Sequence, residues 1–425
     1  MNHAPICVVG NSIAAVSFIE TLRQYGNNED ILLLSKEPYP AYGRPLISYL
    51  LAGKIPRNKI FLRNPDFYIK NNVHFLPGME VIDIDFDKRK GTIYTGKSFT
   101  FDRLFIATGS KPLIPPIKNM ENAPNVFTFT TLQDALDIES NLDGVENVVI
   151  LGAGLIGLKA AEALSYRNRN ISIVQLSDRV LPSVLDRQGA ALFQEYMEND
   201  GIQFYFQQTI DRIVHRDKVL KGVEMKNGDF LPCDLLLITV GVEPNTGFID
   251  KKLLASNKFI SVNRHMQTDI EGIYAAGDVC ESYDLIYNTV RHMPLWPNAY
   301  WQGRFAGLSI LGIPYDFHGH VSMNSIGYKD LPMMSAGIVE DPGLPIEHIK
   351  QADTRSYRRF NFQGERLVGM LFVGDVEDKG VLAHLLKHQE LVPHLKEKIQ
   401  NEDFSFLDYP QEYQTHHFRK AHGKE

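Results

Sequence analysis

Two glycine-rich segments have the residue types and the spacing that can hold a phosphate group. Gly152, Gly154 and Gly157 form a complete G-x-G-x-x-G pattern after the apolar run 148–151. Because glycine has no side chain, the backbone N–H groups of such a turn can approach a pyrophosphate, and the following helix adds the positive end of its dipole. A tight turn that binds no ligand can have the same sequence, so the pattern alone leaves both interpretations open.

A turn of the same kind near the N-terminus is less complete. It begins at Gly10 and has the small residues Ser12 and Ala15 in place of the second and third glycines. Each turn connects a strand-like run to a helical pattern and a second strand, so each unit is typical of a dinucleotide-binding domain, and two units predict two nucleotide sites. The predicted elements are strand 6–10, helix 14–25 and strand 31–34, then strand 148–151, helix 158–166 and strand 171–174.

Two other segments end a strand in small residues. The stretch 101–109 ends with Ala107, Thr108 and Gly109, and the stretch 272–279 contains Gly277 and Asp278. Small residues let the backbone reach a ligand, and the Asp278 carboxylate can accept a hydrogen bond from a hydroxyl or an amide. A Gly-Asp pair by itself is usually only a turn. The proline-rich run 111–116 and the segment 233–244 predict two chain crossings between domains.

In this order the four motifs resemble those of the two-dinucleotide-binding flavoproteins of the pyridine nucleotide-disulfide oxidoreductase superfamily, over roughly residues 5–385. The resemblance implies an α/β fold with two Rossmann-like domains, similar to glutathione reductase, and a C-terminal α+β interface domain. It also implies FAD at the first turn and the Gly-Asp motif, and NAD(P) at the second turn. The expected boundaries are 1–115 and 245–317 for the FAD-binding domain, 116–244 for the NAD(P)-binding domain, 318–390 for the interface domain and 391–425 for a polar peripheral tail.

Cysteine placement separates the branches of this superfamily. The thiol-dependent branches have one or two cysteines beside the flavin, whereas this chain has only Cys7, Cys233 and Cys280. Thiolate chemistry is therefore excluded unless Cys280, which we interpret as a small buried residue, takes part. His318 and His320 have no matching carboxylate or cysteine partner in the sequence, so we expect no metal site.

The segment that replaces the cysteines is Tyr39 to Ser48. Its Tyr42-Gly-Arg-Pro45 element, followed by Ser48, is similar to an element of rubredoxin, ferredoxin and nitrite reductases. The resemblance implies that Arg44, with Pro45, lies along FAD, and a solvated surface arginine is the alternative.

The stretch 294–307, with Trp296 and Pro297, resembles the family helix that points at the flavin pyrimidine edge. The dipole of this helix would stabilise negative charge on the reduced flavin, and an ordinary core role is the alternative for Trp296. The stretch 360–375 resembles the interface domain of the rubredoxin-reductase group, and 318–324 resembles flavoprotein subunits of iron–sulfur enzymes.

Three positions differ from the family pattern. Gln175 stands where an acidic residue would bind the ribose 2′-hydroxyl, so the preference for NADH is weakened, and the nearby Arg179 could serve a 2′-phosphate or pair with Asp178. Lys159 replaces a glutamate near the nicotinamide and is our candidate catalytic residue, and a lysine that points away from the site is the alternative. Ser35 replaces the acidic ribose ligand of the first unit, and Glu37 is the expected substitute. The implied cofactor-binding set is completed by Val81, Leu155, Ile156 and Gly241.

Composition excludes several other classes of protein. The 425 residues include 44 Lys and Arg against 51 Asp and Glu, a formal charge of −7, so we expect neither a nucleic-acid partner nor an anionic membrane surface. No apolar run approaches the roughly 20 residues of a membrane span. The chain opens with a strand-like run and no basic or apolar leader, so we expect a soluble, cytoplasmic protein.

Three functions remain open at this stage. The first is an FAD-dependent oxidoreductase in which NAD(P)H, with NADH slightly favoured, gives a hydride to flavin N5 and single electrons pass to an iron–sulfur protein such as a ferredoxin, a rubredoxin or a subunit of a larger enzyme. The second is an NAD(P)H oxidase or small-acceptor reductase without a redox cysteine. The third is a protein that holds FAD without turnover. A homodimer and a hetero-complex are both compatible with the sequence.

Overall fold

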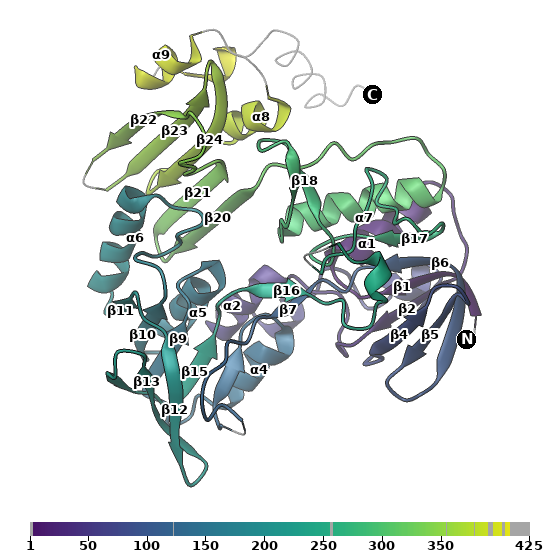
Figure 1. The fold of residues 1–425 in the computed structure, drawn as a ribbon, viewed down its shortest axis with the longest axis horizontal. Coiled ribbons are helices and arrows are strands. Elements are labelled where there is room, and N and C mark those ends of the chain that lie inside the picture. The colour runs from purple at the N-terminus through teal and green to yellow at the C-terminus, as the bar shows by residue number, and fades with distance from the viewer. Residues whose placement is uncertain are drawn as a thin grey trace. The chain divides into compact units, whose positions relative to one another are not determined.

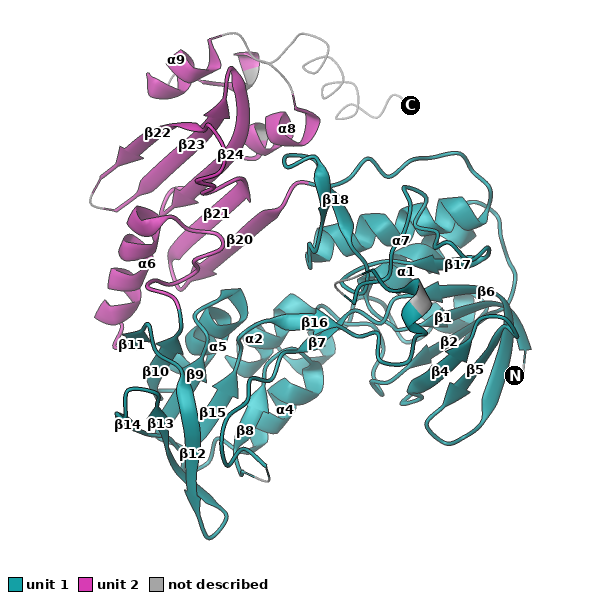
Figure 2. Ribbon diagram, in the orientation of Figure 1, with its two compact units in different colours: residues 1–176, 203–320 teal, residues 177–202, 321–425 magenta. Residues whose placement is uncertain are grey.

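The computed structural model describes residues 3–121, 123–255, 258–353, 355–377, 379–389, 394–401 and 404–408. The chain forms two compact units, and each unit combines separate stretches of the sequence (Figure 2). Unit 1 contains residues 1–176 and 203–320, and unit 2 contains residues 177–202 and 321–425. Both glycine-rich turns lie in unit 1.

The first sheet of unit 1 has the strand order β3-β2-β1-β6-β5-β4, and β17 pairs with β6 (Figure 1). Strands β1, β2, β3, β6 and β17 are parallel, and their register aligns Val9 with Ile106 and Ile106 with Ala275. Gly10, Ala107 and Gly277 each follow these strand ends by one or two residues, so the three predicted motifs meet at one carboxyl edge. The strands are β1 (His3–Val9), β2 (Ile31–Ser35), β3 (Val73–Pro77), β4 (Val81–Asp85), β5 (Lys90–Ile93), β6 (Ser98–Ile106) and β17 (Ile273–Ala275).

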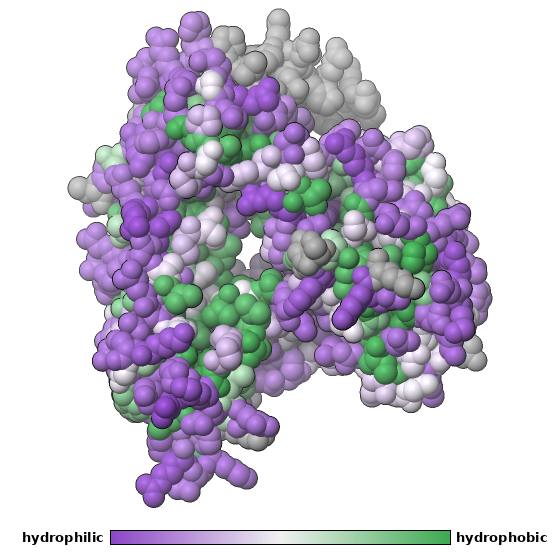
Figure 3. Space-filling view, viewed as in Figure 1, coloured by the Kyte–Doolittle hydropathy of each residue, from purple (hydrophilic) through white to green (hydrophobic). Residues whose placement is uncertain are grey.

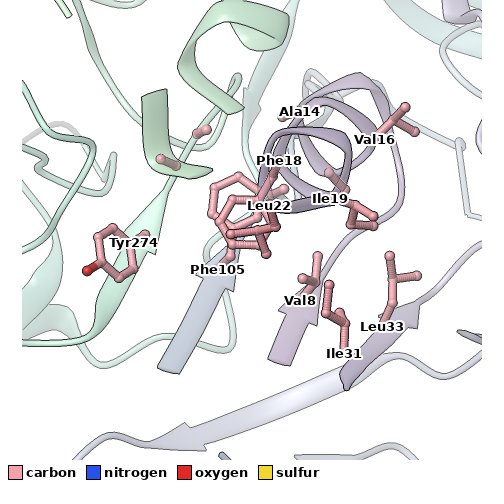
Figure 4. Packing of buried hydrophobic residues seen from close by; sticks show 14 of the residues in the cluster. Val8, Ala14, Val16, Phe18, Ile19, Leu22, Ile31, Leu33, Phe105 and Tyr274 are labelled. Carbon is pink, nitrogen blue, oxygen red and sulfur yellow. The ribbon is translucent and has the colours of Figure 1, made fainter. Parts of the chain in front are cut away.

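Two helices cover this sheet. In α1 (Ile13–Gln24) apolar side chains point to the strands, and Phe18 stacks on Phe105 of β6 with ring centroids 4.1 Å apart (Figure 4). Helix α7 (Trp296–Ile310) packs on α1 through Gly303, where a Cβ atom would lie 2.2 Å from the Ala14 carbonyl oxygen. The contact between the two helices is therefore backbone to backbone.

The second sheet of unit 1 is entirely parallel, with the order β11-β10-β9-β15-β8. Helix α5 (Leu155–Ser165) follows β9, and α4 (Leu132–Ser140) follows β8. The two predicted crossings, β7 (Ser110–Pro112) and β16 (Val242–Pro244), pair with each other as antiparallel strands. The sheet strands are β8 (Val126–Thr128), β9 (Asn147–Leu151), β10 (Asn170–Gln175), β11 (Gln203–Phe206) and β15 (Leu235–Ile238). One sheet with a parallel core and antiparallel edge strands, and a second sheet that is entirely parallel, confirm the expected α/β class.

Unit 1 also contains smaller elements. An antiparallel sheet is formed by β12 (Ile210–Arg216), β13 (Val219–Met225) and β14 (Phe230–Pro232), and hydrophilic side chains cover its protruding hairpin (Figure 3). A second hairpin is formed by β18 (Ser282–Asp284) and β19 (Thr289–Arg291). Helices α2 (Ile47–Leu51) and α3 (Phe67–Lys70) are short.

Unit 2 is an antiparallel sheet with helices. Its strand order is β20-β21-β24-β23-β22, and α6 (Arg187–Asn199) belongs to it although residues 177–202 fall inside the expected 116–244 range. The domain boundaries expected from the sequence remain predictions. No helix in the described part of the chain is long and apolar enough to cross a membrane. The remaining elements are β20 (Met323–Tyr328), β21 (Leu331–Gly337), β22 (Glu347–Ala352), β23 (Tyr357–Gln363), β24 (Arg366–Val373), α8 (Gly380–His388) and α9 (Leu395–Gln400). Most of the predicted tail, from 409 onward, lies outside the described residues.

Candidate cofactor sites

The first turn requires glycine at its first position. Gly10 has φ +104°, and a Cβ atom there would lie 2.2 Å from the carbonyl oxygen of Ala107. The backbone of Gly10 donates to Leu34 at 2.8 Å, and that of Ala107 donates to Val9 at 2.8 Å. Ser12 is the N-cap residue of α1, and Ala15 is fully buried. The turn therefore places the start of α1 directly against the end of β6, where Ala107, Thr108 and Gly109 follow.

The second turn repeats this arrangement and explains all three glycines. Gly152 has φ +113°, and a Cβ atom there would lie 2.6 Å from the carbonyl oxygen of Thr239. At Gly157 a Cβ atom would lie 2.0 Å from the Gly152 carbonyl oxygen, so this glycine lets α5 pack against the turn. Gly154 is the N-cap residue of α5 and has nothing within 4 Å of the corresponding position. This open space beside a helix N-terminus fits a pyrophosphate. Leu155 and Ile156 are half-buried in the first turn of the helix.

Gln175, at the end of β10, is tied to this turn. Its side-chain oxygen accepts a hydrogen bond of 2.8 Å from the Ala153 N–H. Gly241 has φ +129°, and its carbonyl accepts from the Leu113 N–H at 3.0 Å, so it stabilises the paired crossings. The expected contact of Gln175 with the nucleotide ribose remains a prediction.

Within unit 2, Arg179 is engaged by acidic side chains. Its guanidinium lies 3.2 Å from the Asp178 carboxylate and 2.9 Å from that of Glu340, and its Nε donates to the Leu185 carbonyl at 3.4 Å. The pairing with Asp178 is one of the two alternatives left open by the sequence. Glu340 could not be predicted as a partner, because it lies 161 residues away along the chain.

The Gly-Asp motif is fixed by two residues that the sequence reasoning missed. The fully buried Gln302 of α7 accepts a hydrogen bond of 2.8 Å from the Gly277 N–H through its side-chain oxygen. The Ser110 hydroxyl donates to the Asp278 carboxylate at 2.8 Å. Burial raises the pKa of Asp278, although the Ser110 hydrogen bond and the nearby His292 and Arg44 oppose this shift. The half-buried Asp278 carboxylate can also accept hydrogen bonds from ligand hydroxyls.

Arg44 is held in place by other side chains. It pairs with the Glu37 carboxylate and donates to the Thr130 carbonyl at 3.0 Å. The Tyr42 hydroxyl donates to Glu37 at 2.5 Å and accepts from the Leu132 N–H at 2.9 Å. Arg44 is thus half-buried in a defined cluster, whereas Pro45 is exposed. This arrangement argues against a freely solvated arginine. The Glu37 carboxylate is bound by both Arg44 and Tyr42.

Lys159 lies on α5 and points toward α2. Its ammonium pairs with Glu162, whose side chain is only 8% exposed, and lies 5.1 Å from the centre of the Tyr49 ring. Lys54 reaches the same carboxylate at 3.6 Å. These side chains line a small, open hollow together with Ser48, Ala52 and Ala163. The lysine that replaces the family glutamate therefore has its counter-charge one helical turn further along α5.

Three predicted residues lie at the surface or in the sheet. Trp296 and Pro297 begin α7, and Trp296 is 38% exposed, so it is not an ordinary core residue. Val81 is buried at the start of β4. The contacts with FAD that the sequence predicts for these three residues remain predictions.

The three cysteines are buried. Burial raises the pKa of all three thiols, that of Cys233 to about 12, and the Cys280 thiol donates to the Gly277 carbonyl at 3.3 Å. A thiol in this state is not a nucleophile at neutral pH. The geometry therefore argues against thiolate chemistry at Cys280.

Comparisons with known proteins agree with this geometry. Residues 4–303 match the pyridine nucleotide-disulphide oxidoreductase family. The chain is 29% identical to the assimilatory nitrate reductase electron transfer subunit of Bacillus subtilis, covering 95% of this chain and about half (52%) of that protein. It is 27% identical to the NADH-dependent phenylglyoxylate dehydrogenase subunit epsilon of Aromatoleum evansii, covering 92% and 94% of the two chains.

Two further similarities support the assignment. The NADH oxidase of Methanocaldococcus jannaschii is 32% identical, with 78% of this chain and 75% of that protein covered. The solved structure of an NAD-dependent persulfide reductase from A. fulgidus superposes with a TM-score of 0.84 at 26% identity, covering 92% and 78%. The chain therefore belongs to the pyridine nucleotide-disulphide oxidoreductase family, whose members are FAD-containing, NAD(P)H-linked oxidoreductases.

Proposed function

We propose that this protein passes electrons between a nicotinamide nucleotide and an iron–sulfur protein or iron–sulfur subunit. The observation that carries the proposal is the flavin-proximal segment 39–48, which has no thiol and whose Arg44 pairs with Glu37 just before the segment. All three cysteines are buried elsewhere. A flavoenzyme without a thiol relay must pass its electrons directly to the acceptor. The names of the nitrate reductase and phenylglyoxylate dehydrogenase subunits support an acceptor that is another protein chain.

The residues of this chain bind and orient the cofactors. Gly10, Ala107 and Asp278 would hold FAD at the carboxyl edge of the first sheet, and Gly152 and Gly154 would hold the nucleotide pyrophosphate. Bound FAD supplies the chemistry that converts two-electron transfer from the nucleotide into one-electron transfer to the acceptor. Because the segment offers no thiol, catalysis would depend on orientation and on the charges that surround the site.

We infer NADH as the preferred nucleotide. The Gln175 side chain can hydrogen-bond a ribose hydroxyl while its oxygen holds the turn, and Arg179 already has two carboxylate partners in unit 2. A guanidinium that is neutralised in this way is a poor receptor for an additional phosphate. We also propose the cytoplasmic location that is expected from the sequence.

Lys159 is the candidate that would act on the nicotinamide half-reaction. Its ammonium is fixed by Glu162 and by the Tyr49 ring, so it is pre-oriented rather than mobile. Lys159→Met should slow flavin reduction by NADH at least tenfold while the dissociation constant of NADH changes little. An arginine at this position should restore part of the rate, which a purely structural role would not require.

An anaerobic titration tests the proposal. The purified protein is titrated separately with NADH and NADPH while its visible spectrum is recorded, and an acidic [2Fe–2S] ferredoxin is then added. We expect one equivalent of NADH to bleach the flavin and the ferredoxin to reoxidise it. If neither nucleotide bleaches the flavin and reduced ferredoxin cannot do so, the chain holds FAD without turnover and the proposal is wrong.

A second candidate function is an NADH oxidase. The observation that favours it is the 32% identity with an NADH oxidase. In that case air-saturated buffer would support rapid, saturable NADH consumption without any protein acceptor, whereas the electron-transfer function predicts slow oxygen consumption that ferredoxin overtakes.

A further inference from the structure

The segment that follows α2 carries a concentration of positive charge. Residues 54–63 contain four cationic side chains and no acidic one, in a chain whose net charge is −7. Two of the four have carboxylate partners, since Lys54 lies 3.6 Å from Glu162 and Arg63 lies 2.6 Å from Glu20.

The other two cations, Arg57 and Lys59, face solvent. They form a single 3₁₀ turn and are both exposed. Within the described part of the chain, neither has a carboxylate within ion-pair distance, and the guanidinium of Arg57 lies over the Tyr39 ring at 5.5 Å from its centre. Their charges are therefore exposed to solvent and are not neutralised by a carboxylate within the described residues.

Backbone hydrogen bonds fix this turn to the flavin-proximal segment. The Gly43 N–H donates to the Ile60 carbonyl at 2.8 Å, and the Leu62 N–H donates to the Ala41 carbonyl at 2.9 Å. Tyr42 and Phe61 form an antiparallel bridge between these bonds. The pairing thus joins Ile60, the residue after the Arg57–Lys59 turn, to Gly43, the residue before Arg44, which is expected to lie along FAD.

We propose that the turn 56–59, which we call the basic turn, is the docking surface for the acidic face of an iron–sulfur electron-transfer protein. The inference rests on the proposed function and names the partner surface that it would use. Exposed cations without internal partners attract an acidic protein over long range and orient it. A partner bound there lies next to the flavin-proximal segment, so a short path for electrons follows from the backbone pairing.

The stoichiometry of the reaction is compatible with this surface. NADH loses two electrons and releases one proton to solvent as it becomes NAD+, and two acceptor molecules each take up one electron. The acceptor must therefore bind and leave twice in each turnover. Docking through exposed charges suits such short encounters, because it increases the association rate more than it prolongs binding.

A charge-reversal experiment with a matched control tests the docking surface. The variant is R57E/K59E, and the control is K90E/K97E, which reverses two exposed cations on β5 and the turn after it. Both variants change the net charge equally. The probe is an acidic [2Fe–2S] ferredoxin, and kcat/KM for its reduction is measured with NADH at low and high salt. The rate of flavin bleaching by NADH without ferredoxin reports on the nucleotide half-reaction in every variant.

We expect R57E/K59E to lower kcat/KM for ferredoxin at least tenfold at low salt, to weaken its dependence on salt and to leave flavin bleaching unchanged. The control should behave as the unmodified protein. Equal losses in the two variants, or no loss in R57E/K59E, would overturn the basic turn as the docking surface while the proposed function stands. If the unmodified protein is bleached by NADH but reduces no ferredoxin, the proposed function fails, and the docking surface fails with it.

Discussion

Two glycine-to-alanine substitutions in the same turn should separate packing from ligand binding. At Gly157 a Cβ atom would lie 2.0 Å from the Gly152 carbonyl oxygen, so α5 must retreat from the turn. Overpacking of this kind costs about 1–3 kcal/mol. At Gly154 nothing lies within 4 Å, and its φ of −81° suits alanine. A poorer N-cap costs about 0.5–1 kcal/mol, and the stiffer unfolded chain returns about 0.4–1 kcal/mol. Gly154→Ala should therefore leave stability almost unchanged.

For NADH binding the order of the two variants should be reversed, so that Gly154→Ala weakens binding more than Gly157→Ala does. The methyl group of Gly154→Ala enters the space assigned to the pyrophosphate, and we expect NADH to bind at least tenfold more weakly, which is about 1.4 kcal/mol. Urea unfolding measures the first effect, and an anaerobic NADH titration of the flavin measures the second. If Gly157→Ala unfolds at the same urea concentration as the unmodified protein, the packing argument is wrong. If Gly154→Ala binds NADH normally, the turn does not hold the nucleotide.

Three further predictions concern single carboxylates and the nucleotide preference. Burial raises the pKa of Asp278, so its contribution to stability is present below the ordinary value of about 3.9 and is lost as the pH rises through the folded pKa. Asp278→Asn should therefore raise the urea midpoint of the FAD-free protein at pH 7 and weaken FAD binding. A lowered midpoint would contradict this. Burial also opposes ionisation of Asp186, but hydrogen bonds from Tyr357, Gly189 and Arg359 outweigh it and lower the pKa. Its contribution is present above about pH 3.9 and is lost on acidification through the folded pKa. Asp186→Asn should cost about 1–3 kcal/mol at pH 7, because the buried Arg359 loses its nearer carboxylate and keeps only Glu340 at 3.3 Å; an unfolding curve that matches the unmodified protein would refute this. Gln175→Glu can still accept the hydrogen bond from the Ala153 N–H. Because a carboxylate repels the 2′-phosphate, the preference for NADH over NADPH, measured as the ratio of kcat/KM values, should increase at least tenfold. An unchanged ratio would mean that the 2′-position of the nucleotide lies elsewhere.

The sequence was sufficient for the elements that carry the turns. The predicted helix 14–25 is Ile13–Gln24, and the predicted strand 148–151 is Asn147–Leu151. Apolar periodicity determines such elements locally, and the glycine spacing marks the place where strand and helix meet. The family resemblance supplied the order of the domains, which periodicity cannot give.

The sequence was not sufficient for the contacts that fix the site. Gln302 holds the Gly277 N–H from 25 residues away, and Ser110 holds Asp278 from 168 residues away. The sequence signal for Gln302 is a polar amide on the face of α7 that carries the small residues Ala299, Gly303 and Ala306. The partners of Arg44 and Lys159 likewise depend on how α2, α4 and α5 approach one another, and no local pattern encodes that approach.

The two turns show why an incomplete glycine pattern can build the same structure as a complete one. Gly10 faces the Ala107 carbonyl as Gly152 faces the Thr239 carbonyl, and both glycines have φ above +100°. This contact with the neighbouring strand is the invariant part of the design, because any Cβ atom would collide with backbone. The third position is different, since it only sets how closely the helix approaches the turn.

In the second domain that approach is made by Gly157. In the first domain Ala15 occupies the third position, and the close approach occurs instead between helices, where Gly303 of α7 contacts the Ala14 backbone. Helix α7 also carries Gln302, which holds the Gly-Asp motif. Ala15 is therefore compatible with the same strand–turn–helix arrangement, because the close packing that Gly157 permits in the second domain occurs in the first domain at Gly303 of α7, the helix that holds Gly277 of the Gly-Asp motif.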